Sequence, residues 1–393
     1  MIDDARPKNV GELARFTRDL TAEARAGRLE PVRCRNDEVA RVIDILLRHG
    51  KNNPALVGSA GVGKTAIVEG FAQRIAGGEV PFVLRDVRVL SLDHVALLAG
   101  TTYRGQYEER IRMLVEQVTA SPDVILFIDE LHNLIGQGTA MGAAMDAANM
   151  LKPSLVRGDF RVIGATTDEE YDRWVGGDPA LERRFQKVAV RELGVPETVD
   201  IIRARKERLE RHHNVVITDE AIDAAVELTD KYVLDRRRPD KALDALDEAC
   251  AHTQAISTYP PRAEALMRDR VRLLRESSAA RSPGARTGAS SGDPTNPEWG
   301  QMARDGMTAL ERFGAELEKM FAAPVGAPPA TPASAAPANP PSSEPVSPQT
   351  IAGLGQIETE LAHVLAEEGI VVRGHDVARV VGLMSGRQIA WER

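Results

Sequence analysis

Apolar residues follow two alternating patterns along much of this chain. Short continuous apolar runs predict buried strands, whereas apolar residues three and four positions apart predict helices. The predicted strands cover residues 54–57, 87–90, 124–128 and 161–165. The predicted helices cover residues 11–29, 37–48, 65–76, 106–120 and 145–156. Strands that alternate with helices at this spacing predict an α/β fold with a doubly wound parallel sheet.

The pattern becomes purely helical from Val195 onward, which predicts a second, smaller domain. Helices are expected at residues 196–212, after the N-cap Thr218, and at 240–255. We therefore place a lead-in helix at 1–30, a large α/β domain at 31–194 and a helical domain at 195–275.

The composition changes beyond Arg275. Residues 276–348 are rich in Ser, Ala, Pro and Gly, and are expected to form a disordered low-complexity insert. Within it, residues 302–321 have apolar side chains at helical spacing and predict one amphipathic helix, a candidate partner-binding segment.

Composition and charge narrow the class of protein. With 393 residues and 43% hydrophobic content, the chain can bury a large core. The formal net charge of −8 argues against a protein that coats nucleic acid. Cys34 and Cys250 are too few and too far apart for a disulfide framework or a zinc site. No apolar run is long enough for a bilayer and no signal peptide is evident, so we expect a cytoplasmic protein without a membrane partner.

A phosphate-binding loop lies between the first predicted strand and the helix that follows it. The sequence matches G-x-x-x-x-G-K-[ST] in the order Gly58, Ser59, Ala60, Gly61, Val62, Gly63, Lys64 and Thr65. The glycines let backbone N–H groups surround a phosphate at a helix N-terminus. Lys64 is expected to neutralise the β- and γ-phosphates of ATP and Thr65 to coordinate Mg²⁺. A chance glycine-rich turn is the less favoured alternative.

Two acids end the apolar run at residues 124–128. Apolar residues on both faces predict a central strand, and its carboxyl end is where open α/β sheets bind ligands. Asp129 is assigned to Mg²⁺ and Glu130 to the attacking water, the Walker B pattern. The alternative is a strand that simply ends in solvated acids.

From about Leu13 to Thr253 the chain resembles the first ATPase module of the Clp-type AAA+ unfoldases and disaggregases, which include ClpA, ClpB and ClpC. The resemblance rests on the phosphate loop and Walker B together with an ordered series of further motifs. These are Lys51-Asn52-Asn53-Pro54, Ala66-Ile67-Val68-Glu69-Gly70, Tyr103-Arg104-Gly105, Glu108-Glu109-Arg110, Leu131-His132, Asn149-Met150-Leu151-Lys152-Pro153, Gly164-Ala165-Thr166-Thr167, Leu181-Glu182-Arg183-Arg184-Phe185-Gln186 and Pro239-Asp240-Lys241-Ala242.

The resemblance implies roles for several further residues. Thr167 falls at the sensor position, with Thr166 as second choice, and Arg183 and Arg184 match arginine fingers that act on a neighbouring subunit. Tyr103 matches the pore-loop aromatic that grips a protein substrate. The helical domain becomes a lid over the nucleotide, completed by residues 349–393. Nucleotide contacts are implied for Val32, Pro239, Asp240 and Lys241.

The sequence departs from the family pattern at three positions that concern the binding of the nucleotide base or of the protein substrate. Arg33 and Arg238 stand where the family has apolar residues near adenine, and Thr102 stands where it has a basic residue before the pore-loop aromatic. We hypothesise altered base recognition through arginine stacking. It is at least as favoured that both arginines point to solvent.

The resemblance implies an ATP- and Mg²⁺-dependent motor that assembles as a homo-hexamer and remodels protein substrates, with or without an adaptor. We expect a single-module protein, because no second ATPase module or docking loop for a Clp peptidase is evident. One alternative is an ATP-dependent switch or scaffold that recruits a partner without threading. A nucleic-acid remodeller, suggested by Arg236-Arg237-Arg238, is the least favoured because the chain is acidic.

Overall fold

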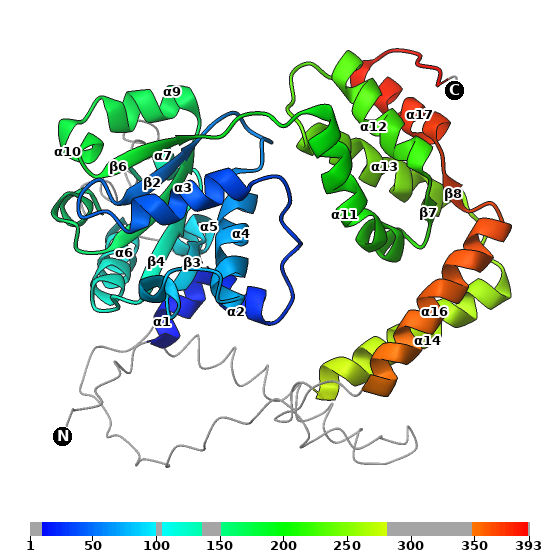
Figure 1. Cartoon of the computed structure of the whole chain (residues 1–393), viewed down its shortest axis with the longest axis horizontal. Helices are drawn as coiled ribbons and strands as arrows, with labels where there is room; N and C mark the ends of the chain where they lie inside the picture. Colours follow the sequence, from blue (N-terminus) through cyan, green and yellow to red (C-terminus); the bar gives the residue numbers. More distant parts are fainter. Residues whose placement is uncertain (1–9, 100–103, 136–150, 281–347, 392–393) are drawn as a thin grey trace, which may run out of the picture. The chain divides into compact units, whose positions relative to one another are not determined.

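The computed structural model describes residues 10–99, 104–135, 151–280 and 348–391 (Figure 1). The chain divides into two compact units. The larger comprises residues 1–259 and 362–393, and the smaller comprises residues 260–361.

A six-stranded sheet forms the centre of the larger unit. Its strands are β1 (Thr17–Asp19), β2 (Asn53–Val57), β3 (Arg88–Leu92), β4 (Val124–Ile128), β5 (Arg161–Thr166) and β6 (Phe185–Ala189). The spatial order is β1-β3-β4-β5-β2-β6, and all neighbours are parallel except β1, which is antiparallel to β3. The doubly wound parallel sheet predicted from the sequence is confirmed.

Helices cover both faces of this sheet. They are α1 (Val10–Phe16), α2 (Leu20–Arg25), α3 (Asn36–Leu46), α4 (Lys64–Ala76), η1 (Phe82–Leu84), α5 (His94–Leu98), α6 (Arg104–Thr119), α7 (Leu131–Ile135), α9 (Asp168–Tyr171), η2 (Asp172–Gly176) and α10 (Pro179–Glu182). Residues 151–157 are also helical; the amino-terminal part of the helix predicted for 145–156 lies outside the described residues.

Alternate side chains of the central strands enter two separate hydrophobic cores. In β4, Leu126 and Ile128 pack in one core with α6, whereas Ile125 and Phe127 pack in the other with α4. This is the arrangement expected of parallel strands that are buried on both faces. The continuous apolar run at 124–128 therefore reflects burial on both sides.

The lead-in segment differs from the single helix predicted for residues 11–29. The structure instead has α1, the short strand β1 and α2. Asp19 caps α2 by accepting a hydrogen bond from the Ala22 N–H, and it also pairs with Arg88 of β3. Because of these contacts and the pairing of β1 with β3, residues 17–19 form a strand and interrupt the helix that the apolar spacing alone predicts.

The lid is built from two separate parts of the chain. Its elements are α11 (Val195–His213), β7 (Val216–Ile217), α12 (Asp219–Tyr232), α13 (Asp240–Ile256), β8 (Val371–Val372) and α17 (Gly374–Ser385). β8 pairs with β7 in parallel, and α17 packs against α12 and α13. The Thr218 hydroxyl donates to the Val372 carbonyl at 2.9 Å, while the same side chain caps α12. The carboxyl-terminal segment thus belongs to the core of this domain.

The smaller unit contains α14 (Pro261–Ala280) and most of α16 (Pro348–Glu367) (Figure 1). The two helices run antiparallel, because Arg262 pairs with Glu360 whereas Leu273 lies beside Gly353. Residues 276–280, expected to begin the low-complexity insert, are instead the last turn of α14. The remainder of the insert, with the amphipathic helix predicted at 302–321, lies outside the described residues.

None of the described helices combines the length and apolar content needed to cross a membrane.

Replacing Phe127 with alanine tests the importance of the core on the α4 face. Phe127 is fully buried, so the substitution is expected to lower the free energy of unfolding by about 3–5 kcal/mol. The matched control is Phe82→Ala, because Phe82 is 79% exposed and its loss should change stability by less than about 0.5 kcal/mol. Urea denaturation followed by circular dichroism measures both. Equal losses from the two variants would contradict this view of the core.

Candidate nucleotide-binding site

The phosphate loop connects β2 to α4 along a backbone path that requires glycine. Gly61 and Gly63 have φ angles of +79° and +90°, which glycine adopts without the steric cost other residues pay. At Gly58, a Cβ atom would lie 2.3 Å from the Val190 carbonyl oxygen, so any side chain would collide with the neighbouring segment. The three glycines of the motif therefore shape the loop itself.

Lys64 begins α4 and folds back over this loop. Its ammonium donates hydrogen bonds to the carbonyls of Gly58 at 2.8 Å and Ser59 at 3.0 Å. Burial lowers the pKa of Lys64, while the nearby carboxylates, Asp129 foremost, act in the opposite direction. A desolvated cation at the mouth of a glycine loop is well suited to bind phosphate.

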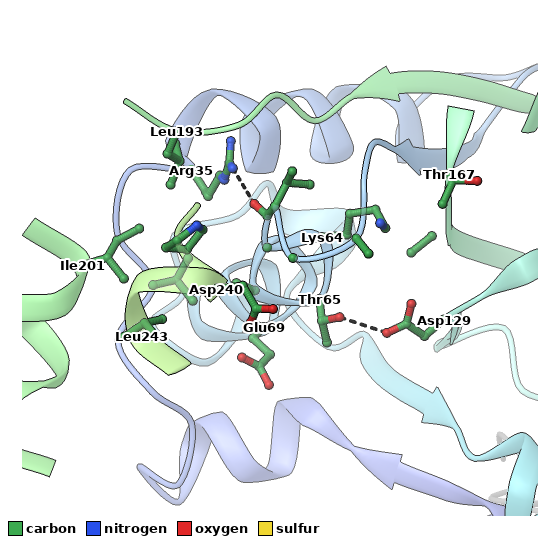
Figure 2. Close-up of a pocket in the computed structure, with 18 of the residues that line it drawn as sticks. Arg35, Lys64, Thr65, Glu69, Asp129, Thr167, Leu193, Ile201, Asp240 and Leu243 are labelled. Atoms are coloured by element: carbon green, nitrogen blue, oxygen red, sulfur yellow. Dashed lines mark hydrogen bonds between the residues drawn. The ribbon is translucent and has the colours of Figure 1, made fainter. Parts of the chain in front are cut away.

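The two acids after β4 reach the same place from the neighbouring part of the sheet. The Thr65 hydroxyl donates to Asp129 Oδ2 at 2.9 Å (Figure 2). Glu130 adopts a φ of +51°, uncommon for a residue other than glycine, and its Oε2 accepts a hydrogen bond from the Asn133 amide at 2.6 Å. Asn133 thus holds one oxygen of the Glu130 carboxylate.

A second polar cluster follows β5. The hydroxyls of Thr167 and Thr166 donate to Glu170 Oε2 at 2.7 Å and 3.1 Å, and His132 Nδ1 lies 2.9 Å from the same oxygen. Although burial opposes it, these hydrogen bonds hold the pKa of Glu170 below its usual range. Glu170 therefore fixes the orientation of both threonines.

These groups line one cavity of about 520 Å³, a volume typical of small-molecule sites (Figure 2). One side is polar and contains Lys64, Thr65, Asp129, Glu130 and Thr167. The opposite side contains residues of the segment before α3, of the segment between β6 and α11, and of the lid. Its apolar part is formed by Val32, Leu193, Ile201, Pro239 and Leu243. A polar end beside an apolar end suits a ligand that has phosphates at one end and a flat base at the other.

Comparison with known proteins agrees with this geometry. Residues 54–193 match the ATPase family associated with various cellular activities (AAA), and residues 194–290 match the AAA lid domain. The chaperone ClpB of Aquifex aeolicus is 52% identical over 265 residues, which cover 67% of this chain and 26% of that protein. The negative regulator of genetic competence ClpC/MecB of Bacillus subtilis is 48% identical over 273 residues, covering 69% of this chain and 34% of that protein.

Solved structures show the same relationship. The S. cerevisiae Hsp104-ADP complex superimposes with a TM-score of 0.58 at 37% identity, over 70% of this chain and 54% of that chain. The S. cerevisiae Hsp104:casein complex gives a TM-score of 0.56 at 45% identity, over 62% of this chain and 42% of that chain. This chain contains a Clp-type AAA+ ATPase module. It spans only 26% and 34% of the length of the two curated relatives named above.

The lid contributes fewer of the expected contacts to the AAA+ site than the motifs imply. Pro239 and Asp240 line the cavity, and Asp240 lies against Gly61 of the phosphate loop. Lys241 does not line the cavity. Its buried ammonium lies 3.0 Å from Asp230 and donates to the Val233 carbonyl, which places it inside the lid. The role expected for Lys241 in contacting nucleotide is therefore not supported by its position.

Arg33 and Arg238, the two arginines that depart from the family pattern, differ in their position relative to the cavity. Arg33 is exposed and lines the cavity, so it remains a candidate for contact with the base. Arg238 does not line the cavity, because its Nε lies between Glu192 and Asp230 at 3.2 Å and 3.4 Å. Stacking of Arg238 on a base would require both of these ion pairs to break.

Arg183 and Arg184 follow α10 and do not line the cavity. Arg183 is exposed, whereas Arg184 is partly buried and donates to the Arg157 carbonyl at 2.9 Å. Tyr103, the expected pore-loop residue, lies outside the described residues.

Several polar residues in or beside the cavity were given no role from the sequence, among them Arg35, His132, Asn133 and Glu170. For Glu170 a local signal existed, because Thr167 and Glu170 have the T-x-x-E spacing of a capping box, which the structure forms. His132 lies within a quoted motif, but nothing in that motif indicates its partners, and Arg35 belongs to none of the motifs quoted above. Asn133 follows Glu130 by three residues, and its backbone N–H donates to the Glu130 carbonyl at 2.8 Å, so the turn that leads into α7 brings the two residues together.

The residues present suit a Mg²⁺ ion that is shared with the phosphates of a nucleotide. Within the described residues, no group of three or more His, Cys, Asp or Glu side chains is placed to hold a metal by itself. Thr65 and Asp129 offer two oxygen donors from different elements. Mg²⁺ prefers oxygen donors and usually takes only one or two ligands from the protein.

Replacing Lys64 with alanine is expected to weaken ATP binding by about 10- to 100-fold, because it removes a charged hydrogen-bond donor from the phosphate site. Isothermal titration calorimetry with ATP measures the change. The control is Lys231→Ala, since Lys231 is exposed on α12 of the lid and lies outside the cavity. Unchanged ATP affinity in the Lys64 variant would rule out this location for the phosphates.

Proposed function

We propose that this chain binds and hydrolyses ATP with Mg²⁺ and uses the energy to remodel protein substrates within a homo-hexameric ring. The observation that supports ATP hydrolysis most directly is the hydrogen bond between Thr65 of the phosphate loop and Asp129. This hydrogen bond links the phosphate loop to the Walker B acids, and both line the same cavity as Lys64 and Glu130. Membership of the Clp-type AAA+ family supports the remodelling role.

The residues at the polar end of the cavity have distinct roles in the proposed reaction. Lys64 and the N–H groups of the phosphate loop bind the phosphates, and Thr65 and Asp129 hold Mg²⁺, which supplies charge neutralisation to the phosphates when bound. Asn133 holds the Oε2 atom of Glu130, and the Oε1 atom of the same carboxylate orients the attacking water. Thr167, fixed by Glu170, helps to place that water beside the terminal phosphate.

Arg183 and Arg184 are proposed to act on the nucleotide of the adjacent subunit. Their location outside their own cavity supports this, because charge supplied from a neighbour makes hydrolysis depend on assembly. A guanidinium suits the task since it delivers paired donors to developing charge on phosphate oxygens. Arg183 is the better placed of the two, because it is exposed and Arg184 is bound to the Arg157 carbonyl.

Protein substrates are proposed on the basis of the relatives. The S. cerevisiae Hsp104 relative has been solved in a complex with casein, at 45% identity to this chain. Tyr103 is proposed to grip an extended substrate, since an aromatic ring offers a large contact area at low entropic cost.

Replacing Glu130 with glutamine is expected to preserve ATP binding but lower the turnover number by at least about 100-fold, because the amide cannot accept a proton from water. The matched control is Glu169→Gln, an exposed acid in the first turn of α9 that does not line the cavity. Turnover is measured by phosphate release, and binding by calorimetry. If the Glu130 variant hydrolyses ATP normally, another residue must orient the water.

Ring assembly and substrate use are tested together by measuring ATP turnover per subunit. Turnover is expected to increase with protein concentration and with added unfolded casein. In Tyr103→Ala the ratio of casein-stimulated to basal turnover should fall towards one, whereas Phe82→Ala, which removes an exposed aromatic elsewhere, should retain the stimulation. Turnover that is independent of concentration and of casein would favour an assembly switch over a motor.

A further inference from the structure

Arg35 is a buried cation to which the proposed reaction assigns no role. It lies at the N-cap of α3 and is only 4% exposed. Its Nη1 donates to Glu38 Oε1 at 2.6 Å, and its Nη2 donates to the Arg191 carbonyl at 2.9 Å. The same Nη2 donates to the Val62 carbonyl at 2.6 Å, the hydrogen bond drawn from Arg35 in Figure 2. One guanidinium therefore joins three segments that are far apart in the sequence.

Two of these segments matter for the nucleotide. Val62 belongs to the phosphate loop, and Arg191 lies between the end of β6 and the start of the lid helix α11. The same segment supports the loop at its other end, where Val190 donates to the Val57 carbonyl at 2.7 Å and leaves no room for a side chain at Gly58. The loop is thus supported near its start by backbone contacts and near its end by Arg35.

The orientation of the peptide after Val62 follows from the Arg35 contact. In a planar trans peptide the C=O and the N–H point in opposite directions. Because the Val62 carbonyl points to the guanidinium, the N–H of Gly63 must point away from it. Without that contact, the Val62–Gly63 peptide could rotate, and Gly63 has no side chain to resist.

We propose that Arg35 is a positioning residue for the phosphates of the nucleotide. It fixes the Val62–Gly63 peptide so that the loop N–H groups face the phosphates, and it ties this loop to the segment that leads into the lid. The proposal rests on the nucleotide binding proposed above. It assigns Arg35 no direct contact with nucleotide, since three of its hydrogen bonds already go to protein oxygens.

The test compares ATP with adenosine, which lacks phosphates, as competitors of a fluorescent ADP analogue. Arg35→Met keeps the bulk of the side chain but removes every donor. It is expected to weaken ATP binding by about 10- to 100-fold and to leave adenosine binding near that of the unaltered protein. Arg41→Met is the matched control, because Arg41 is exposed on the same helix. Equal loss of ATP and adenosine affinity, or no loss of either, would overturn the proposal.

Arg35→Lys separates geometry from charge. A lysine keeps the charge but is a single point donor in place of a planar fork, so it cannot hold both carbonyls in the same way. ATP binding should therefore stay weak in this variant, and full recovery would show that only the charge matters. If Arg35→Met does not fold, as judged by circular dichroism, Arg35→Lys decides the question. The proposal then requires this variant to lose affinity for ATP but not for adenosine. Failure of the unaltered protein to bind ATP would instead refute the proposed function.

Discussion

The parallel pairing of β2, β5 and β4 is the constraint on which the whole site depends. β5 lies between the other two and pairs Thr166 with Val57 and Gly164 with Ile128. Parallel strands end at a common edge, so the phosphate loop, the Walker B acids and Thr167 emerge side by side. Packing fixes the pairing register of these strands, because a slip of one residue would move each side chain from one hydrophobic core into the other. The positions of the reactive groups are therefore fixed by packing of side chains that take no part in the chemistry.

The parts of the site that the sequence predicts are those attached directly to such buried strands. Asp129 and Glu130 follow an apolar run, and Lys64 follows a glycine pattern, so local sequence is enough to place them. The strand β1 shows where this reasoning fails. Leu13, Phe16, Leu20 and Ala24 keep helical spacing across residues 17–19, yet those residues pair with the edge of the sheet. A distant strand, which local periodicity does not include, decides their structure.

Charged residues whose partners are distant in the sequence were the hardest to predict. Arg35 and Arg191 are separated by 156 positions, and only the folded chain brings them into contact. Lys241 illustrates the opposite case, because the family resemblance implied a nucleotide contact for it but the structure does not place it in the cavity. The structure buries its ammonium beside Asp230, where an unpaired charge would be costly. For such residues, the sequence gives the charge but not the partner that determines its role.

The charges around Lys64 bear on the form in which ATP would bind. Asp129, Glu170, Asp168 and Glu130 all lie near enough to affect the pKa of this single lysine. A free triphosphate would bring further negative charge to a region where carboxylates already outnumber the cation. In the proposed reaction a divalent cation would offset this charge, and Thr65 with Asp129 provides oxygen donors for it. The acidic surroundings of the phosphate site are thus one reason why the proposed reaction uses the magnesium complex of ATP.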